Sequence, residues 1–151
     1  MRWPRRSRPS SPFGTPSRRQ RCIGPVYAFY KEDTGEPAAL RDVRADGLAL
    51  AMTGLWERWK DWGTGIRARH SYITTVPNEL CRPIHDRMPV ILPREKWATW
   101  LGEHEADPDE LRWMVLRPYP AALMRAYPVD VRVGNFRNND AALLDEISLA
   151  A

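Results

Sequence analysis

The first half of the chain alternates between short apolar runs and clusters of turn-forming residues. Four apolar runs have the length and composition of strands, at residues 22–30, 38–43, 48–56 and 66–75. KEDTGEP and RADG separate the first three runs, and sequences rich in Gly, Pro and Asp form tight turns. We therefore predict consecutive antiparallel strands over this region.

The second half mixes strand and helix signals. Its strands are expected at residues 88–92 and 127–133, and its helices at residues 93–101 and 107–115. Pro93 suits the first position of one helix, and Asp107 suits the N-cap of the other. Residues 134–139, GNFRNN, are typical of a loop. The order of elements predicts the α+β class, a mostly antiparallel β core with short peripheral helices.

The composition is that of one folded domain. The chain has 151 residues, and 43% of them are hydrophobic, which is enough to bury a single core. No apolar run approaches the length of a membrane span, and no secretory signal is visible. We therefore expect a cytoplasmic monomer that does not contact membranes.

The net charge of +4 conceals an asymmetry. Residues 1–31 contain eight of the 23 basic residues and no acidic residue, whereas the remainder carries 15 basic and 19 acidic residues. Residues 1–16, rich in Arg, Pro and Ser, are expected to be disordered, and residues 17–151 to form the domain. The basic segment is either a solvated tail or an arm that contacts nucleic-acid phosphates.

The cysteines and histidines are not spaced as metal ligands. Cys22 and Cys81 lie outside any CxxC pattern, and free cysteines of this kind are usually small buried hydrophobic residues. His70, His85 and His104 have no ligand spacing with them. We expect no metal and no cofactor.

Three tryptophans recur at three-residue spacing in GLWERWKDWG. Trp56, Trp59 and Trp62 are expected to pack in the core or at its rim, because aromatic side chains bury large apolar areas. The alternative is that they stack against unpaired bases.

His85 is the strongest single candidate for chemistry. It precedes the expected MPVIL strand and is followed by Asp86 and Arg87, whose charges can tune its protonation near neutral pH. Taken alone, a histidine in this position is more often structural than catalytic.

Two pairs of polar residues are weaker candidates. Thr74 and Thr75 end the strand before the His85 loop, where a hydroxyl can orient a phosphate or a sugar oxygen, although threonine is also common in strands. Asn135 and Asn138 either bind a ligand or satisfy the backbone groups of their own turn.

Five blocks occur in an order that resembles the SOS response-associated peptidase (SRAP) family. They are RCIGPVYAFY, LALAMTGLWERW, YITTVPNELCRPIHDRMPVIL, LRPYPAALMRAYPVDVRVGN and NNDAALLDEI, and they extend over about residues 17–147. The IHDRMPVIL and GLWERW blocks are the hallmarks of the resemblance.

The resemblance implies a largely β fold, here an incomplete β-barrel, that binds single-stranded DNA and captures abasic sites. In the family, an amino-terminal cysteine condenses with the sugar aldehyde to form a thiazolidine, and a proposed self-processing peptidase activity exposes that cysteine. A glutamate and a histidine assist proton transfer. The histidine matches His85, Arg87 matches a position expected to hold DNA phosphate, and Thr74 matches an active-site position. We also expect Asn135, in the loop at residues 134–139, to contact DNA.

The chain departs from the family at the residues of the covalent chemistry. It begins Met1-Arg2, so removal of the methionine would expose an arginine without a thiol. Neither Cys22 nor Cys81 substitutes, since the family shares the RCI strand that contains Cys22 and this cysteine has no free α-amine. The asparagine-alanine-arginine segment of the family site is also missing, and we expect an amino-terminally truncated or decayed copy.

The family glutamate is displaced as well. If the strand aligns without a gap, Lys31 replaces the acid and Glu32 follows one residue later. A shift of one residue turns a strand side chain to the other face, so Glu32 is expected to point away from His85. An alignment with a two-residue deletion loses the acid altogether.

Three functions follow from these observations. The first is a family-type enzyme acting at abasic sites, with His85 as acid and base and Arg87 as a phosphate ligand. The second is a module that grips single-stranded DNA without covalent chemistry. The third is an unfolded or chaperone-bound fragment whose apolar faces and sheet edges are uncovered.

Overall fold

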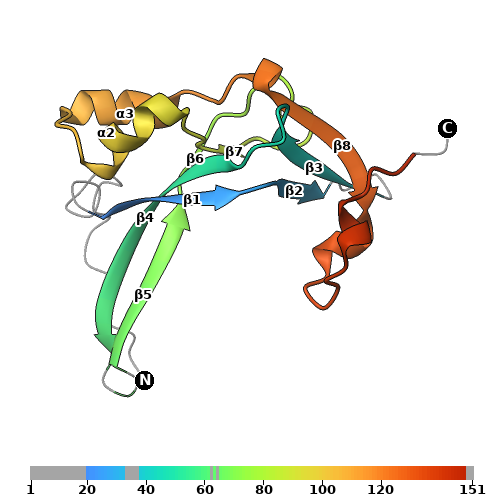
Figure 1. The fold of residues 1–151 in the computed structure, drawn as a ribbon, viewed down its shortest axis with the longest axis horizontal. Helices are drawn as coiled ribbons and strands as arrows, with labels where there is room; N and C mark the ends of the chain where they lie inside the picture. The colour runs from blue at the N-terminus through green and yellow to red at the C-terminus, as the bar shows by residue number, and fades with distance from the viewer. Residues whose placement is uncertain (1–19, 33–37, 62, 64, 149–151) are drawn as a thin grey trace.

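Three antiparallel sheets carry the fold (Figure 1). The computed structural model describes residues 20–32, 38–61, 63 and 65–148. The first sheet has the order β1-β4-β5, with β1 at Arg21–Val26, β4 at Leu50–Asp61 and β5 at Gly65–Tyr72. The second has the order β2-β3-β8, with β2 at Phe29–Glu32, β3 at Ala38–Arg44 and β8 at Met124–Asp130. The third pairs β6 at Thr74–Thr75 with β7 at Met88–Pro89.

The helices are short and peripheral. The 3-10 turn η1 (Arg94–Lys96) leads into α2 (Trp97–Leu101), which lies beside α3 (Pro108–Leu116) in Figure 1. Three further 3-10 turns follow, η2 at Ala121–Leu123, η3 at Val131–Gly134 and η4 at Ala141–Leu144. This arrangement confirms the α+β class, and the sheets of the described region do not close into a barrel. Among the described residues, no helix is both long and apolar enough to cross a membrane.

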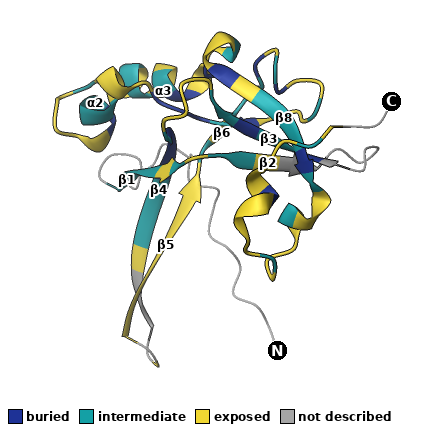
Figure 2. Ribbon diagram, turned by 45° about the vertical axis from the view of Figure 1, so that its right-hand side comes forward, coloured by how far each residue is buried: buried dark blue, intermediate teal, exposed yellow. Residues whose placement is uncertain are grey.

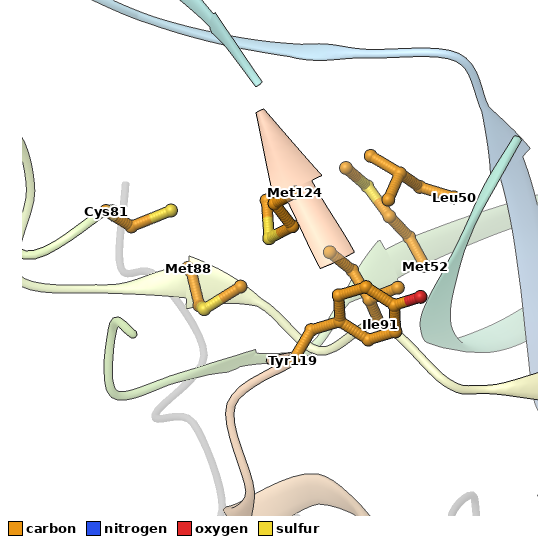
Figure 3. Close-up of a cluster of buried hydrophobic side chains, with 7 residues drawn as sticks. All are labelled: Leu50, Met52, Cys81, Met88, Ile91, Tyr119 and Met124. Atoms are coloured by element: carbon orange, nitrogen blue, oxygen red, sulfur yellow. The ribbon is translucent and has the colours of Figure 1, made fainter. Parts of the chain in front are cut away.

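The central strand β4 is packed on both faces. Its alternating side chains send Leu50 and Met52 toward one hydrophobic cluster and Leu55 toward the other. The first cluster, shown in Figure 3, consists of Leu50, Met52, Cys81, Met88, Ile91, Tyr119 and Met124. The second contains Val90, Leu92, Trp100 and Val115. Burial on both faces explains why this part of the sequence is a nearly continuous apolar run.

The expected strand at residues 22–30 is in fact two strands that belong to different sheets. β1 ends at Val26 beside Leu50, and β2 begins at Phe29 beside Asp42. The run PVYAFY contains no break signal between these strands, so periodicity could not reveal the crossing. Pro25 is tolerated because β1 is an edge strand.

The expected strand at residues 66–75 is also divided, at Ile73. The Ile73 N–H donates to the Thr53 carbonyl at 3.0 Å, and its own carbonyl accepts from the Val90 N–H at 2.9 Å. The strand expected at residues 88–92 is regular only in β7, with an isolated bridge from Ile91 to Met52. Residues 88–92 are therefore anchored by several strands instead of by one ladder.

Two strand boundaries differ because local contacts override the apolar pattern. The strand expected at residues 48–56 continues to Asp61, within the hairpin that β4 forms with β5. The strand expected at residues 127–133 begins at Met124 and ends at Asp130. Asp130 Oδ1 accepts from the Arg132 N–H at 2.8 Å and so begins η3. This bond and that from the Arg132 side chain hold the pKa of Asp130 below its usual value.

Several sequence predictions fall on residues that can be described only in part. Trp56 is half-buried, consistent with packing at the rim of the core, while the side chains of Trp59 and Trp62 lie outside the described residues. The same holds for residues 1–16 and for the side chain of Glu32, whose backbone pairs with Ala39.

The start of α3 follows its sequence signal closely. Asp107 Oδ1 accepts from the Glu110 N–H at 2.8 Å, and Pro108 occupies the first turn. Pro93, expected as the first residue of the other helix, is instead the residue that precedes η1. α2 ends at Gly102, whose φ of 84° is a left-handed conformation that favours glycine.

We predict that Asp107→Ala lowers the free energy of unfolding by about 1 kcal/mol, because the Glu110 N–H loses its acceptor. Asp107→Asn is the matched control and should stay within a few tenths of the wild-type value, because asparagine caps equally well. Urea unfolding measures both. Equal losses in the two variants would show that the cap does not stabilise α3.

Candidate functional site

A cavity of about 580 Å³ lies between the first sheet, the start of β2 and the segment that leads into β7. Its polar lining includes Thr74, His85 and Arg87, three of the four residues singled out from the sequence. Aromatic and sulfur-containing side chains supply much of the rest: Phe29, Tyr30, Met52, Tyr72 and Met88. None of the described lining residues is acidic, so Arg87 gives the cavity a positive character.

The loop that presents His85 is organised by a buried amide. Asn78 is only 3% exposed, and its Nδ2 donates to the Tyr119 carbonyl at 2.7 Å. Its Oδ1 accepts from the Cys81 N–H at 2.9 Å, and the Cys81 carbonyl in turn accepts from the His85 N–H at 3.0 Å. Asn78 thus positions His85 through the backbone. No pattern in the sequence singled out Asn78 for this role.

His85 has a partner for each of its protonation states. Nδ1 accepts from the Arg87 N–H at 3.0 Å, a bond that suits the neutral ring, and lies 2.8 Å from Asp86 Oδ1, a contact that suits the protonated ring. In the described part of the chain, Nε2 makes no hydrogen bond. The side chain is about half exposed, at 49%. The ring is therefore exposed at the cavity, where it can hydrogen-bond a ligand.

Arg87 is available to a ligand. Its Nε lies 3.6 Å from Asp86 Oδ1, and both side chains are largely exposed. Exposed ion pairs of this kind contribute little free energy, so a phosphate can replace the carboxylate as the partner of the guanidinium.

The two threonines of β6 have different roles because neighbouring strand residues face opposite sides. Thr74 is exposed and lines the cavity. The Thr75 hydroxyl instead donates to the Leu116 carbonyl at 3.2 Å and so ties β6 to the end of α3. Of this pair, Thr74 is the one that can meet a ligand in the cavity.

A glycine on β1 allows Tyr72 to lie across the sheet. Tyr72 pairs with Gly54 on β4, which in turn pairs with Cys22 on β1. A Cβ added at Gly24, also on β1, would lie 2.2 Å from the Tyr72 hydroxyl oxygen. The absence of that Cβ therefore sets the position of a cavity wall. Nothing in the sequence singled out Tyr72 or these glycines.

Asn135 does not line the cavity. It is exposed at the end of η3, and its Oδ1 accepts from the Arg137 N–H at 3.1 Å. Asn138 Nδ2 donates to the Arg132 carbonyl at 2.8 Å. These contacts agree with the alternative that both asparagines satisfy their own turn, and a contact of Asn135 with DNA stays a prediction.

Neither cysteine lines the cavity. Cys81 is fully buried, as expected, and its thiol lies 3.7 Å from Asp42 Oδ1. Cys22 is half-buried on β1, and burial raises the pKa of its thiol. Among the residues that the structure describes, no three His, Cys, Asp or Glu side chains are grouped to hold a metal ion.

A second hollow, of about 870 Å³, runs along α3 and the segment from Arg117 to Leu123. Asp107, whose side chain caps α3, and Glu110, which pairs with Lys96 at 3.6 Å, line it. The Asp107 carboxylate is therefore committed to the fold, and this hollow contains none of the site residues expected from the sequence. We place the candidate site at the smaller cavity, which contains His85 and Arg87.

The sequence belongs to a known class of proteins. The model of the SOS response associated peptidase (SRAP) family matches residues 7–136, so the chain belongs to this family. This finding confirms the resemblance drawn from the sequence.

Named relatives and solved structures agree with this assignment. The chain is 37% identical over 136 residues to the Bacillus subtilis abasic site processing protein YoaM, and 36% identical over 126 residues to YobE of the same organism. These matches cover 88% and 82% of this chain, and 60% and 57% of the relatives. The chain thus spans less than two thirds of the length of these relatives.

Two crystal structures share the fold. One, of a protein from Bacteroides thetaiotaomicron, has a TM-score of 0.80 at 26% identity and covers 91% of this chain and 62% of its own. The other, from Bordetella bronchiseptica, has a TM-score of 0.65 at 32% identity and covers 74% of this chain and 56% of its own.

We predict that Asn78→Ala lowers the free energy of unfolding by about 1–3 kcal/mol, because the Tyr119 carbonyl and the Cys81 N–H lose their buried partner. Asn138→Ala, which removes one hydrogen bond from a largely exposed turn, is the control and should cost less than about 1 kcal/mol. Denaturant unfolding of both variants tests this. A loss no larger for Asn78→Ala than for Asn138→Ala would contradict the role of the buried amide.

We also predict that Cys22 reacts slowly with iodoacetamide. Its raised pKa lowers the thiolate fraction at pH 8, so alkylation should be slower than in the urea-unfolded chain and should reach half its maximal rate at a higher pH. Mass spectrometry of the peptide that contains Cys22 gives the rates. A folded protein that reacts faster than the unfolded chain would identify Cys22 as an activated nucleophile.

Proposed function

We propose that the cavity binds an abasic site in single-stranded DNA. One observation supports this proposal above all others: an imidazole, a guanidinium and a hydroxyl, from His85, Arg87 and Thr74, surround one cavity with an aromatic and apolar interior. A deoxyribose that has lost its base offers an apolar ring, hydroxyl or aldehyde oxygens and flanking phosphates. The printed names of the relatives, abasic site processing proteins, support the same substrate.

Each polar residue has a role that follows from its chemistry. Arg87 binds a phosphate next to the lesion, because the phosphate can replace the exposed Asp86 carboxylate as the partner of the guanidinium. The Thr74 hydroxyl hydrogen-bonds a sugar oxygen. His85 exchanges a proton with the opened sugar, since Nδ1 has a partner in both states of the ring.

The recognition we propose is non-covalent. In the family, covalent capture uses an amino-terminal cysteine, and the described lining of the cavity contains no thiol and no lysine. The second candidate, covalent capture with the associated peptidase or lyase chemistry, is favoured by membership of the family.

A gel assay separates these two functions. The full chain is incubated with a single-stranded oligonucleotide that contains one abasic site, and the products are run with and without heating in denaturant. We expect a complex under native conditions that salt weakens and that denaturant dissolves. A band that survives heating would establish the covalent function instead. Absence of any complex with abasic DNA would overturn the proposed function.

Variants test the assignment of residues within the same assay. Arg87→Ala should weaken binding. It should also make the fall of log affinity with log salt concentration less steep by about one unit, because one phosphate contact is lost. Arg112→Ala, which removes the same charge from a residue outside the cavity, is the control and should leave that slope nearly unchanged. Equal effects of the two substitutions would mean that Arg87 acts only through the net charge.

A further inference from the structure

One face of the β4–β5 hairpin continues the wall of the cavity outward. Figure 1 shows β4 and β5 extending together away from the other strands, and every described residue of β5 is exposed (Figure 2). Tyr72, at the inner end of β5, lines the cavity. Residues that follow it on the same face of the hairpin are therefore in line with the candidate site.

The strand register identifies these residues. Paired residues of antiparallel strands share a face, and every second pair lies on the same side. The pair Tyr72 and Gly54 is followed on this side by His70 with Trp56, and then by Ala68 with Arg58. The rings of His70 and Tyr72 are in edge contact, with centroids 5.2 Å apart at 75°, which confirms that they share a face.

This face differs from the opposite one. From the cavity outward, the ring of Tyr72 is followed by the paired rings of His70 and Trp56, and exposed Arg58 lies at the next level. Arg58 makes no ion pair with any residue in the described ranges. On the opposite face, Arg69 is paired with Glu57. Among the described side chains, the face that leads out of the cavity therefore combines aromatic rings with an arginine, Arg58, that makes no ion pair.

We propose that this face, which we call the stacking face and which consists of Tyr72, His70, Trp56 and Arg58, binds the unpaired nucleotides on one side of the lesion. The proposal rests on the proposed function of the cavity. Aromatic rings beside a cationic residue are the pattern that binds single strands, because each base can stack on a ring and a phosphate can pair with the arginine. Four residues of strand separate the level of Tyr72 from that of Arg58, or about 13 Å, enough for a few nucleotides.

Stacking and charge can be separated by the choice of DNA. Binding is measured with three single-stranded oligonucleotides of equal length, each with a central abasic site. One has bases on both sides, and the other two carry base-free spacers in place of three nucleotides on the 5′ or on the 3′ side. Phosphates are the same in all three, so a difference in affinity reports contacts with bases.

For the wild-type chain, we expect one of the two spacer oligonucleotides to bind roughly tenfold more weakly than the fully based one. The double variant His70→Ala/Arg58→Ala should bind the oligonucleotide with bases on both sides about as weakly as the wild type binds that spacer oligonucleotide. It should no longer distinguish between the two oligonucleotides. Arg69→Ala, on the opposite face, is the control and should keep the full discrimination. Because His70, Arg58 and Arg69 are exposed, the urea midpoints of all variants should remain close to that of the wild type.

Other results would overturn the proposal in distinguishable ways. If the wild type binds all three oligonucleotides equally, or if the double variant discriminates as the wild type does, the stacking face does not contact bases while the function of the cavity stands. If Arg69→Ala loses the discrimination to the same extent, the effect is not specific to this face. If the wild type binds no abasic single-stranded DNA, the proposed function and the stacking face both fail.

Discussion

The structure depends on one strand that is constrained from four sides. β4 is hydrogen-bonded to β1 along one edge and to β5 along the other, and both of its faces are covered. Met52 faces the cavity, while Leu55 packs against the helix side. Gly54, between them, pairs with Tyr72, whose ring lies over Gly24 on the neighbouring strand β1. The inner half of β4 is rigid because it is packed on both faces and hydrogen-bonded along both edges. It therefore fixes the position of one wall of the cavity.

The histidine and the arginine of the cavity come from a different kind of structure. His85 and Arg87 stand on an irregular segment, where the side chains can reach a ligand but the backbone lacks a ladder of hydrogen bonds. Buried Asn78 supplies the missing constraint through its bonds to Tyr119 and Cys81. The site therefore combines a strand held by packing with a loop held by one amide. The chain belongs to the SRAP family, and the described lining of its cavity is largely aromatic and apolar, carries Arg87 and contains no cysteine.

Much of the fold and part of the site could be predicted from local patterns. Turn residues located the strand boundaries between residues 30 and 50, and Asp107 marked the start of α3 within one residue. These signals are reliable because a turn or a cap is made by residues that are close in sequence. His85 and Arg87 were recognised by residue type and by their resemblance to a family block, and they do line one cavity.

What the sequence by itself determined is the α+β class, the order of most elements, the cap of α3 and the presence of a charged loop between two apolar runs. Only the tertiary structure decided that PVYAFY crosses between two sheets, that Tyr72 lies over Gly24, and that Asn78 bonds to Tyr119, 41 residues away. The physical reason is that these features depend on contacts between residues far apart in the sequence. Periodicity records which side of an element is buried, whereas these features depend on which distant backbone or side chain arrives at that side, and this is settled only when the chain has packed.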